Sequence, residues 1–177
     1  MFQKDFYRNT GKQWKWYMFY RLLFSYHLRF LLYLRILQNR KLILFHPIAF
    51  VGRYLISKKH GLSILPQTKI GEGFRMIHPT AIDINPRSVI GKNVNVFKGA
   101  TIGWTEGKHR GAPVLGNNVQ VGINSTVVGG IKIGDDVLIA PNTFLNQDVP
   151  SHSIVIGNPA VVISKENATK RYVDFCV

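Results

Sequence analysis

The most constraining feature of the sequence is a six-residue period that begins at Ile64. With two interruptions, aliphatic side chains recur at Ile64, Ile70, Met76, Ile84, Ile90, Val96, Ile102, Leu115, Val121, Val127, Ile133, Ile139 and Leu145. Neither the helical repeat nor the alternation of an ordinary strand gives this spacing. It is typical of a hexapeptide β-helix, in which three short strands with their turns make one triangular coil. We therefore expect a mainly β fold of about four or five coils, with the aliphatic side chains stacked inside.

Two insertions break the period. Ile82 and Asp83 add two residues shortly after His78, and residues 103–114 add a polar, glycine-rich loop. Insertions in a solenoid form surface loops, often on the functional face. The region of His78 and the loop are therefore the places where we expect chemistry.

The first sixty residues differ from the repeat in composition. They hold twelve Lys and Arg residues against one acid, Asp5, so they carry +11 of the total net charge of +14. The stretch Tyr17–Leu37 predicts one helix, and residues 47–59 predict a second, with Pro47 in its first turn. We divide the chain into a basic, aromatic helical segment (1–60), a β-helix (61–163) and a C-terminal tail (164–177).

The helical segment is too charged to cross a bilayer, because residues such as Arg21 and Arg29 interrupt every apolar window. The N-terminus also lacks the pattern of a signal peptide, so a cytoplasmic protein is expected. Trp14, Trp16 and the clustered basic residues favour peripheral binding of residues 1–60 to an anionic membrane surface. Packing on the rest of the protein or on a partner subunit is the alternative, and both interpretations stand.

The repeat resembles the hexapeptide-repeat acyltransferases, and within them the serine acetyltransferase branch. The resemblance lies in residues 61–78 (GLSILPQTKIGEGFRMIH), 96–103, 112–122 and 129–163, which contain the closing VPSHS and GNPA. It is greatest to bacterial polysaccharide O-acetyltransferases such as the colanic acid acetyltransferase, whose N-terminal segment residues 1–60 also resemble. The resemblance implies a left-handed parallel β-helix with an N-terminal α-helical segment, acetyl-CoA as co-substrate, and a homotrimer with active sites between subunits.

His78 falls on the family's catalytic histidine, in the sequence RMIHPTA. A hydroxyl is a poor nucleophile at neutral pH, and histidine, with a pKa of about 6.5, is suited to take its proton. The resemblance implies that neutral His78 deprotonates the acceptor hydroxyl, which attacks the acetyl carbonyl directly. His78 then protonates the departing CoA sulfur, and no acyl-enzyme forms.

The resemblance also implies where acetyl-CoA lies, in a groove between neighbouring subunits. The expected contacts are Gly103, Trp104, Gly122, Ile123, Ala140 and Pro141. Backbone N–H groups near Gly103 and Trp104 are candidate donors to the developing oxyanion. Lys165, with Lys170 and Arg171, is expected to meet the CoA phosphates. The alternative for each glycine is a coil corner, and for the basic tail a solvated surface.

Three positions depart from the serine enzymes. Ser63 stands where they have the acid that orients the histidine, Ile77 where an aspartate reads the amino acid, and Ala112 where a second histidine precedes a proline. A zwitterionic amino acid needs charged partners, so we expect a neutral acceptor instead. The predicted function is acetylation of a sugar hydroxyl, on a free or lipid-linked glycan, in bacterial surface polysaccharide synthesis. Serine O-acetyltransferase is the alternative.

Other residues near the two insertions are candidates for substrate contact or for orienting His78. They are Asp83, Asn85, His109 and Arg110. No metal is expected. The zinc site of the γ-class carbonic anhydrases, which share the fold, needs three histidines on adjacent coils, two of them a few residues apart, and neither His78 nor His109 has such a companion. The single cysteine, Cys176, excludes a disulfide framework. A non-catalytic membrane-binding module is the alternative from another class, but neither it nor nucleic-acid binding accounts for the His78 motif.

Overall fold

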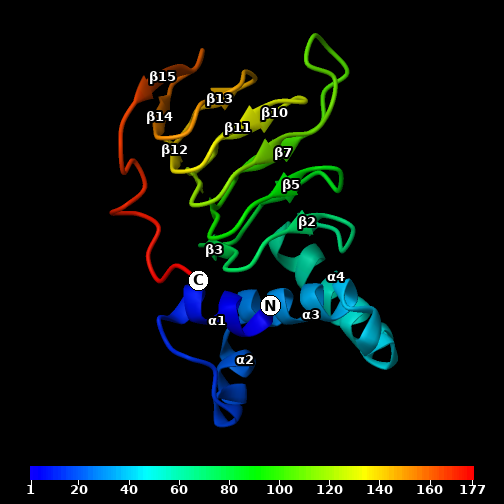
Figure 1. Ribbon diagram of the computed structural model, residues 1–177. Helices are drawn as coiled ribbons and strands as arrows, with labels where there is room; N and C mark the ends of the chain where they lie inside the picture. The colour runs from blue at the N-terminus through cyan, green and yellow to red at the C-terminus, as the bar shows by residue number, and fades with distance from the viewer.

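The computed structural model spans residues 1–177 and describes all of them except the side chains of Tyr17 and Met18. Helices occupy its N-terminal third, one end of the molecule in Figure 1. They are α1 (Phe2–Thr10), the 3-10 helix η1 (Trp16–Phe19), α2 (Tyr20–Phe24), α3 (Tyr26–Gln38), the 3-10 helix η2 (Arg40–Phe45) and α4 (His46–His60).

The predicted continuous helix over Tyr17–Leu37 is wrong, and the side chain of its first residue lies outside the described part. Ser25 has extended backbone angles (φ −120, ψ 96) and separates α2 from α3. Its hydroxyl bonds the His27 ring at 3.0 Å, the local side-chain bonding by which serine competes with helix propagation. The second predicted helix is confirmed as α4, with Pro47 in its first turn and Gly61 as a left-handed C-cap. Helix α1 was not predicted.

The rest of the chain forms the left-handed parallel β-helix that the period indicates. Its strands are β1 (Ser63–Ile64), β2 (Lys69–Ile70), β3 (Arg75–Ile77), β4 (Asp83–Ile84), β5 (Val89–Ile90), β6 (Asn95–Phe97), β7 (Thr101–Gly103), β8 (Val114–Leu115), β9 (Gln120–Val121), β10 (Thr126–Val128), β11 (Lys132–Ile133), β12 (Val137–Ile139), β13 (Phe144–Leu145), β14 (Ser153–Ile156) and β15 (Val161–Ser164).

Three sheets form the sides of the prism. Their strand orders are β1-β4-β7-β10-β13, β11-β8-β5-β2 and β15-β14-β12-β9-β6-β3. Every pairing is parallel except that of β14 with β15. From β1 to β13, successive strands along the chain belong to successive sheets, and the chain turns one of three corners after each strand.

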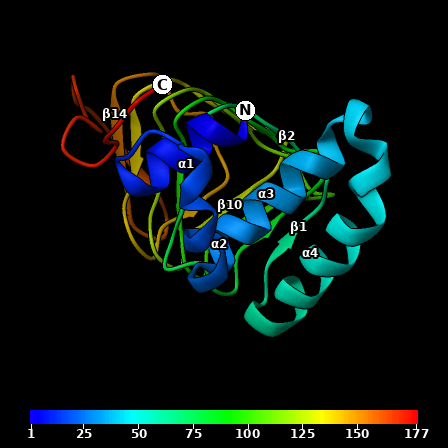
Figure 2. The same cartoon turned by 90° about the horizontal axis from the view of Figure 1, so that it is seen from below.

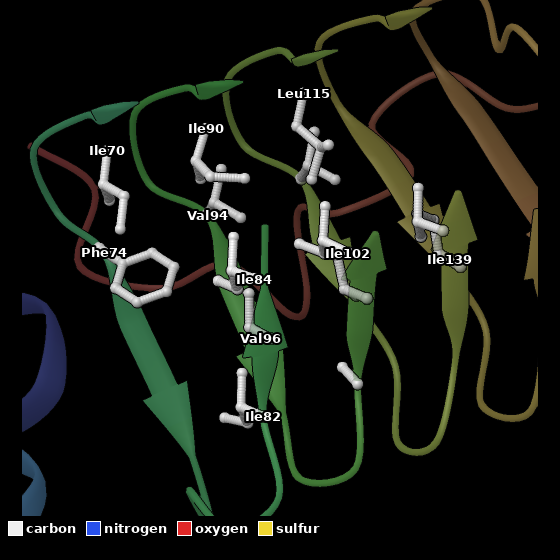
Figure 3. Packing of buried hydrophobic residues seen from close by; sticks show 14 of the residues in the cluster. Ile70, Phe74, Ile82, Ile84, Ile90, Val94, Val96, Ile102, Leu115 and Ile139 are labelled. Carbon is white, nitrogen blue, oxygen red and sulfur yellow. The ribbon is translucent and has the colours of Figure 1, made fainter. Parts of the chain in front are cut away.

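The core is the aliphatic ladder that the sequence predicts. All thirteen side chains of the six-residue period are buried, from Ile64 at 0% exposure to Ile70 at 6%. Figure 3 shows Ile84, Ile90, Val96 and Ile102 stacked between neighbouring coils. This continuous apolar column is what holds a solenoid together, because no single coil buries its own inner face.

The helices close the open end of the column. Phe30, Leu31 and Leu34 of α3 are fully buried in the same cluster as Ile64 and the rest of the ladder. Figure 2 views this end and shows α3 lying across the coils, with α4 beside it. The helices thus serve as the cap that a repeat array needs at its terminus.

Arginines of the helices satisfy the free backbone edge of the first coil. Arg35 donates to the carbonyls of Ile70 (2.8 Å) and Gly71 (2.6 Å) and forms a buried ion pair with Asp5 (2.6 Å). Arg53 donates to the carbonyl of Ile64 (3.2 Å). An unpaired strand edge is a template for aggregation, so these contacts protect the first coil.

Candidate active site

The corner between β3 and β4 is where the first period break lies. His78 and Ala81 both occupy the left-handed region there, with φ of 50 and 51. The two extra residues are accommodated by this longer corner, which leaves the His78 side chain exposed. Within the described part of the chain, no hydrogen bond or ion pair reaches the His78 ring, so the imidazole is free to meet a substrate.

Residues at the equivalent position of the following coils stack on His78 along one corner of the prism. Lys98 donates its N–H to the carbonyl of Ile77 at 3.2 Å, directly after the β3–β6 register. The N–H of Asn124 bonds the carbonyl of Lys98, and that of Asn142 bonds the carbonyl of Ile123. His78, Lys98, Ile123 and Pro141 therefore follow one another up one corner of the prism.

The predicted cofactor residues divide between two corners. Ile123 and Pro141 share the corner of His78, as do Gly122 and Ala140, which directly follow the register partners Val121 and Ile139. A Cβ on Gly122 would lie 2.6 Å from the backbone nitrogen of Pro141, so glycine is required there by coil packing alone. Gly103 and Trp104 lie elsewhere, at the corner after β7.

Charged and hydroxyl side chains line the outer face of the sheet next to His78. Ser63 of β1 is the register partner of Asp83 of β4, which in turn pairs with Thr101 of β7. Ser63 and Asp83 are both exposed, because the alternate residues Ile64 and Ile84 point into the core. A carboxylate therefore lies one strand away from Ser63, on the same face.

Asn85 does not share the corner of His78. It lies after β4, where its side-chain oxygen accepts a 2.9 Å bond from the N–H of Arg87 and its carbonyl accepts one from Ser88. These bonds are those of an Asx turn. Asn85 therefore shapes the coil and is not in place to orient His78.

The loop 103–114 leaves the solenoid at the third coil. Its Trp104 donates to Glu106 (2.8 Å) and lies under the guanidinium of Arg87 (4.6 Å to the ring centroid), and Glu106 also pairs with Arg110 (3.0 Å). His109 is exposed, and its carbonyl accepts the N–H of Gly130 at 2.7 Å. In Figure 1 the loop stands away from the coils beyond β7, whereas β3 lies beside the helices.

One chain therefore does not bring His78 together with His109, Arg110 or Trp104. They occupy different corners of the prism and coils that are two apart. Lys165 is also remote from His78, because it follows β15 at the far end and donates its N–H to the carbonyl of His152. Among the residues with described side chains, no group of three or more His, Cys, Asp or Glu is placed to hold a metal ion.

Lys98 is the residue at this corner that the sequence analysis missed. It is exposed and lies one coil above His78. A lone lysine in a sequence does not indicate a functional site, but the position of Lys98 within the six-residue repeat does. Lys98 follows Val96 of the aliphatic ladder by the same two residues by which His78 follows Met76. Reading the repeat as columns would have found it.

Comparison with known proteins supports the fold and the branch. Residues 112–147 match the family model described as bacterial transferase hexapeptide (six repeats). The chain is 39% identical over 108 residues to the serine acetyltransferase of Helicobacter pylori, covering 60% of this chain and 63% of the relative. It is 40% identical over 128 residues to serine acetyltransferase 2 of Arabidopsis thaliana, covering 71% and 38%. The chain thus spans less than two thirds of these relatives.

Solved structures give the same result. The serine acetyltransferase of Neisseria gonorrhoeae in complex with serine superposes with a TM-score of 0.70 at 26% identity, covering 90% of this chain and 65% of that one. Coils, repeat and family model together define a hexapeptide-repeat transferase fold. Within that class, the chain is similar in sequence and structure to serine acetyltransferases.

The predicted acetylation of a polysaccharide sugar is contradicted by these comparisons, which return serine acetyltransferases from bacteria and plants. The closeness to colanic acid acetyltransferase is likewise not supported. Our prediction assumed that the acceptor site lacks charged residues, because Ser63, Ile77 and Ala112 stand where the serine enzymes have an acid, an aspartate and a histidine. The fold shows why this was unsafe, since the next coil brings Lys98 into register with His78 and places Asp83 on the outer face that carries Ser63.

Proposed function

We propose that the protein is an acetyl-CoA-dependent O-acetyltransferase that acetylates the hydroxyl of serine, with His78 as general base. One observation carries the proposal: an exposed imidazole lies at the irregular corner of the solenoid, with the exposed Lys98 in register on the next coil and the exposed Asp83 on the strand that follows the corner. The similarity to serine acetyltransferases supports serine as the acceptor.

The proposed reaction is a direct transfer. His78 takes the hydroxyl proton as the serine oxygen attacks the acetyl carbonyl, the C–S bond breaks, and His78 gives the proton to the CoA sulfur. Positive charge develops on the imidazole in the transition state. Asp83 is the positioning residue that stabilises this charge, and the hydroxyl of its register partner Ser63 accompanies it.

Lys98 is proposed to bind the carboxylate of the serine acceptor. Its ammonium group is exposed and one coil away from His78, on the same corner. An ion pair at this position would hold the amino acid with its hydroxyl toward the imidazole. The charged partner that a zwitterionic substrate needs is thereby supplied from a different coil.

The complete site is proposed to form between copies of the chain in a homotrimer. His78 and the loop 103–114 lie on different corners, so a neighbouring copy is needed to bring the loop to His78. Acetyl-CoA is then expected along the corner that carries Ile123 and Pro141, with Trp104 and Arg110 contributed by the adjacent subunit. Lys165, at the last coil, is proposed to contact the CoA phosphates.

The test is release of CoA from acetyl-CoA in the presence of L-serine, measured with a thiol reagent, with O-acetylserine identified by mass. Replacing the base in His78→Ala is expected to lower turnover by roughly 10²–10⁴-fold. His46→Gln is the matched control, because this histidine begins α4 in the helical segment, and glutamine can still donate to the carbonyl of Ile36 that its ring contacts. A folded protein that releases no CoA with L-serine would contradict the proposal.

A further inference from the structure

The outer surface of the helices is unusually apolar. The large apolar side chains exposed there are Trp16, Phe19, Tyr20, Leu23, Phe24, Ile43, Leu44, Phe45, Ile48, Phe50, Val51, Tyr54 and Leu55. Several are mostly exposed, including Leu44 at 87% and Phe24 at 86%. We call these residues the apolar cap surface. Large exposed apolar side chains gathered on the helical end of the molecule mark an interaction site.

Helix α4 shows that this surface is not an ordinary solvent face. Its inner side carries the buried Ala49, Gly52 against the ring of Tyr33, and the buried Arg53, and its Ile56 packs against the core. Its outer side carries Ile48 and Leu55, which are 70% and 61% exposed. The outer face of a surface helix in a water-soluble protein is normally polar. The polarity of α4 therefore fits an apolar medium outside the molecule.

The charge around the apolar cap surface has one sign. The exposed basic residues of the helical segment are Lys4, Lys12, Lys15, Arg40, Lys41, Lys58 and Lys59. The only acid among residues 1–60, Asp5, is fully buried and paired with Arg35. Lys58 lies 5.7 Å from the ring centroid of Tyr54, so cationic and aromatic groups are interleaved.

We propose that the apolar cap surface docks the protein on an anionic phospholipid bilayer. Apolar and aromatic side chains enter the headgroup region, and the surrounding lysines and arginines meet lipid phosphates. In the part of the chain that the structure describes, no helix is long and apolar enough to cross a membrane. The helices are therefore placed on the bilayer surface, with α2 and α4 at the contact and the solenoid pointing away from it (Figure 1).

Charge complementarity favours lipid over a second copy of this chain. Two apolar cap surfaces brought face to face would oppose two sets of exposed cations, without an exposed acid in either helical segment. Like charges held in contact are destabilising. An anionic bilayer presents the opposite charge over its whole area and accepts the apolar side chains at the same time.

The experiment is flotation of the full chain with vesicles of phosphatidylcholine, with and without phosphatidylglycerol. We expect binding only to the anionic vesicles, and weaker binding at high salt. The variant Ile48→Ser/Leu55→Ser, and separately Lys58→Gln/Lys59→Gln, is expected to weaken the partition by roughly tenfold or more. Both pairs lie on the exposed side of α4, so the fold is expected to persist, as circular dichroism will show.

Two matched controls change the same residue types elsewhere. Val161→Ser/Ile163→Ser removes exposed apolar side chains of β15, and Lys92→Gln/Lys132→Gln removes exposed lysines of the coils. Both are expected to bind vesicles like the unaltered chain. Absence of binding to anionic vesicles overturns the proposal, and so does equal loss in the controls. Sedimentation will show whether the α4 variants lose a self-association. If they do while vesicle binding is unchanged, the lipid proposal is overturned, and the apolar cap surface binds a second copy of this chain. No outcome depends on the acetyltransferase activity.

Discussion

Ser63 and Asp83 are register partners on the adjacent parallel strands β1 and β4, and both are exposed on one outer face of the solenoid. The corner that carries His78 joins the first coil to the second, so it lies next to both strands. A carboxylate on β4 is therefore available where β1 offers only a hydroxyl. Because the strands are parallel and in register, a side chain needed on one outer face can come from either of two neighbouring coils.

Asp83→Asn should lower kcat by about tenfold or more and leave KM for serine nearly unchanged, because a neutral amide stabilises the developing imidazolium less well. The profile of initial rate against serine concentration, at saturating acetyl-CoA, separates the two constants. Asp148→Asn, in the last coils, is the control. An unaltered profile in Asp83→Asn would remove Asp83 from this role.

Lys98→Met should raise KM for L-serine by about tenfold with a much smaller effect on kcat, because the carboxylate loses its ion pair but the base is intact. Lys98→Arg should restore part of the affinity. The measurement is initial rate against serine concentration at saturating acetyl-CoA. Equal effects on the apparent affinity for acetyl-CoA and for serine would show that Lys98 acts elsewhere.

Mixing subunits tests whether the active site is shared. Trimers of His78→Ala alone, or of a chain whose loop residues 105–110 are replaced by glycines, should be nearly inactive. Co-refolded mixtures should regain a fraction of the activity, because some interfaces then combine an intact His78 with an intact loop. A mixture no more active than its components would indicate a site built within one chain.

Arg35→Met should destabilise the fold by roughly 3–5 kcal/mol, since it leaves the buried carboxylate of Asp5 without its partner. It also frees the carbonyls of Ile70 and Gly71 at the first coil. Denaturant unfolding measures the loss. Arg40→Met, an exposed arginine on η2, serves as the comparison and should cost little. The double variant Asp5→Asn/Arg35→Met should recover part of the stability.

The C-terminal tail should loosen as pH rises. Asp136 accepts bonds from the N–H groups of Ala168 and Thr169 and from the ring of His152. The hydrogen bond to Asp136 raises the pKa of His152 above 6.5, with Glu166 contributing further. A raised histidine pKa gives stabilisation that is complete below about 6.5 and lost as pH passes the raised value.

Limited trypsin digestion at Lys165, Lys170 and Arg171 measures this loosening. Cleavage of the tail relative to cleavage elsewhere should increase above neutral pH. The variant His152→Gln should show the loosened state at every pH. If its tail is cut as slowly as that of the unaltered protein at mildly acidic pH, the ion pair does not hold the tail.

The aliphatic period was sufficient to predict the coils. A side chain at every sixth position can be buried together only in a triangular solenoid, so thirteen residues specified the core without any tertiary information. The same reasoning failed at Ser25, where a local hydroxyl bond interrupts a sequence without glycine or proline. It also missed α1, whose Asp5 and Arg8 are buried only because they meet the first coil.

The sequence by itself determined the solenoid, its irregular corner and the exposed histidine on it, because these follow from spacing along the chain. Only the tertiary structure decided which charges accompany that histidine. Lys98 comes from the second coil and aligns with His78 through the parallel register, and Asp83 lies on the adjacent sheet as the register partner of Ser63. Position-by-position reading treated the substitutions at Ser63 and Ile77 as loss of charge, whereas the stacked coils supply charge from the next turn.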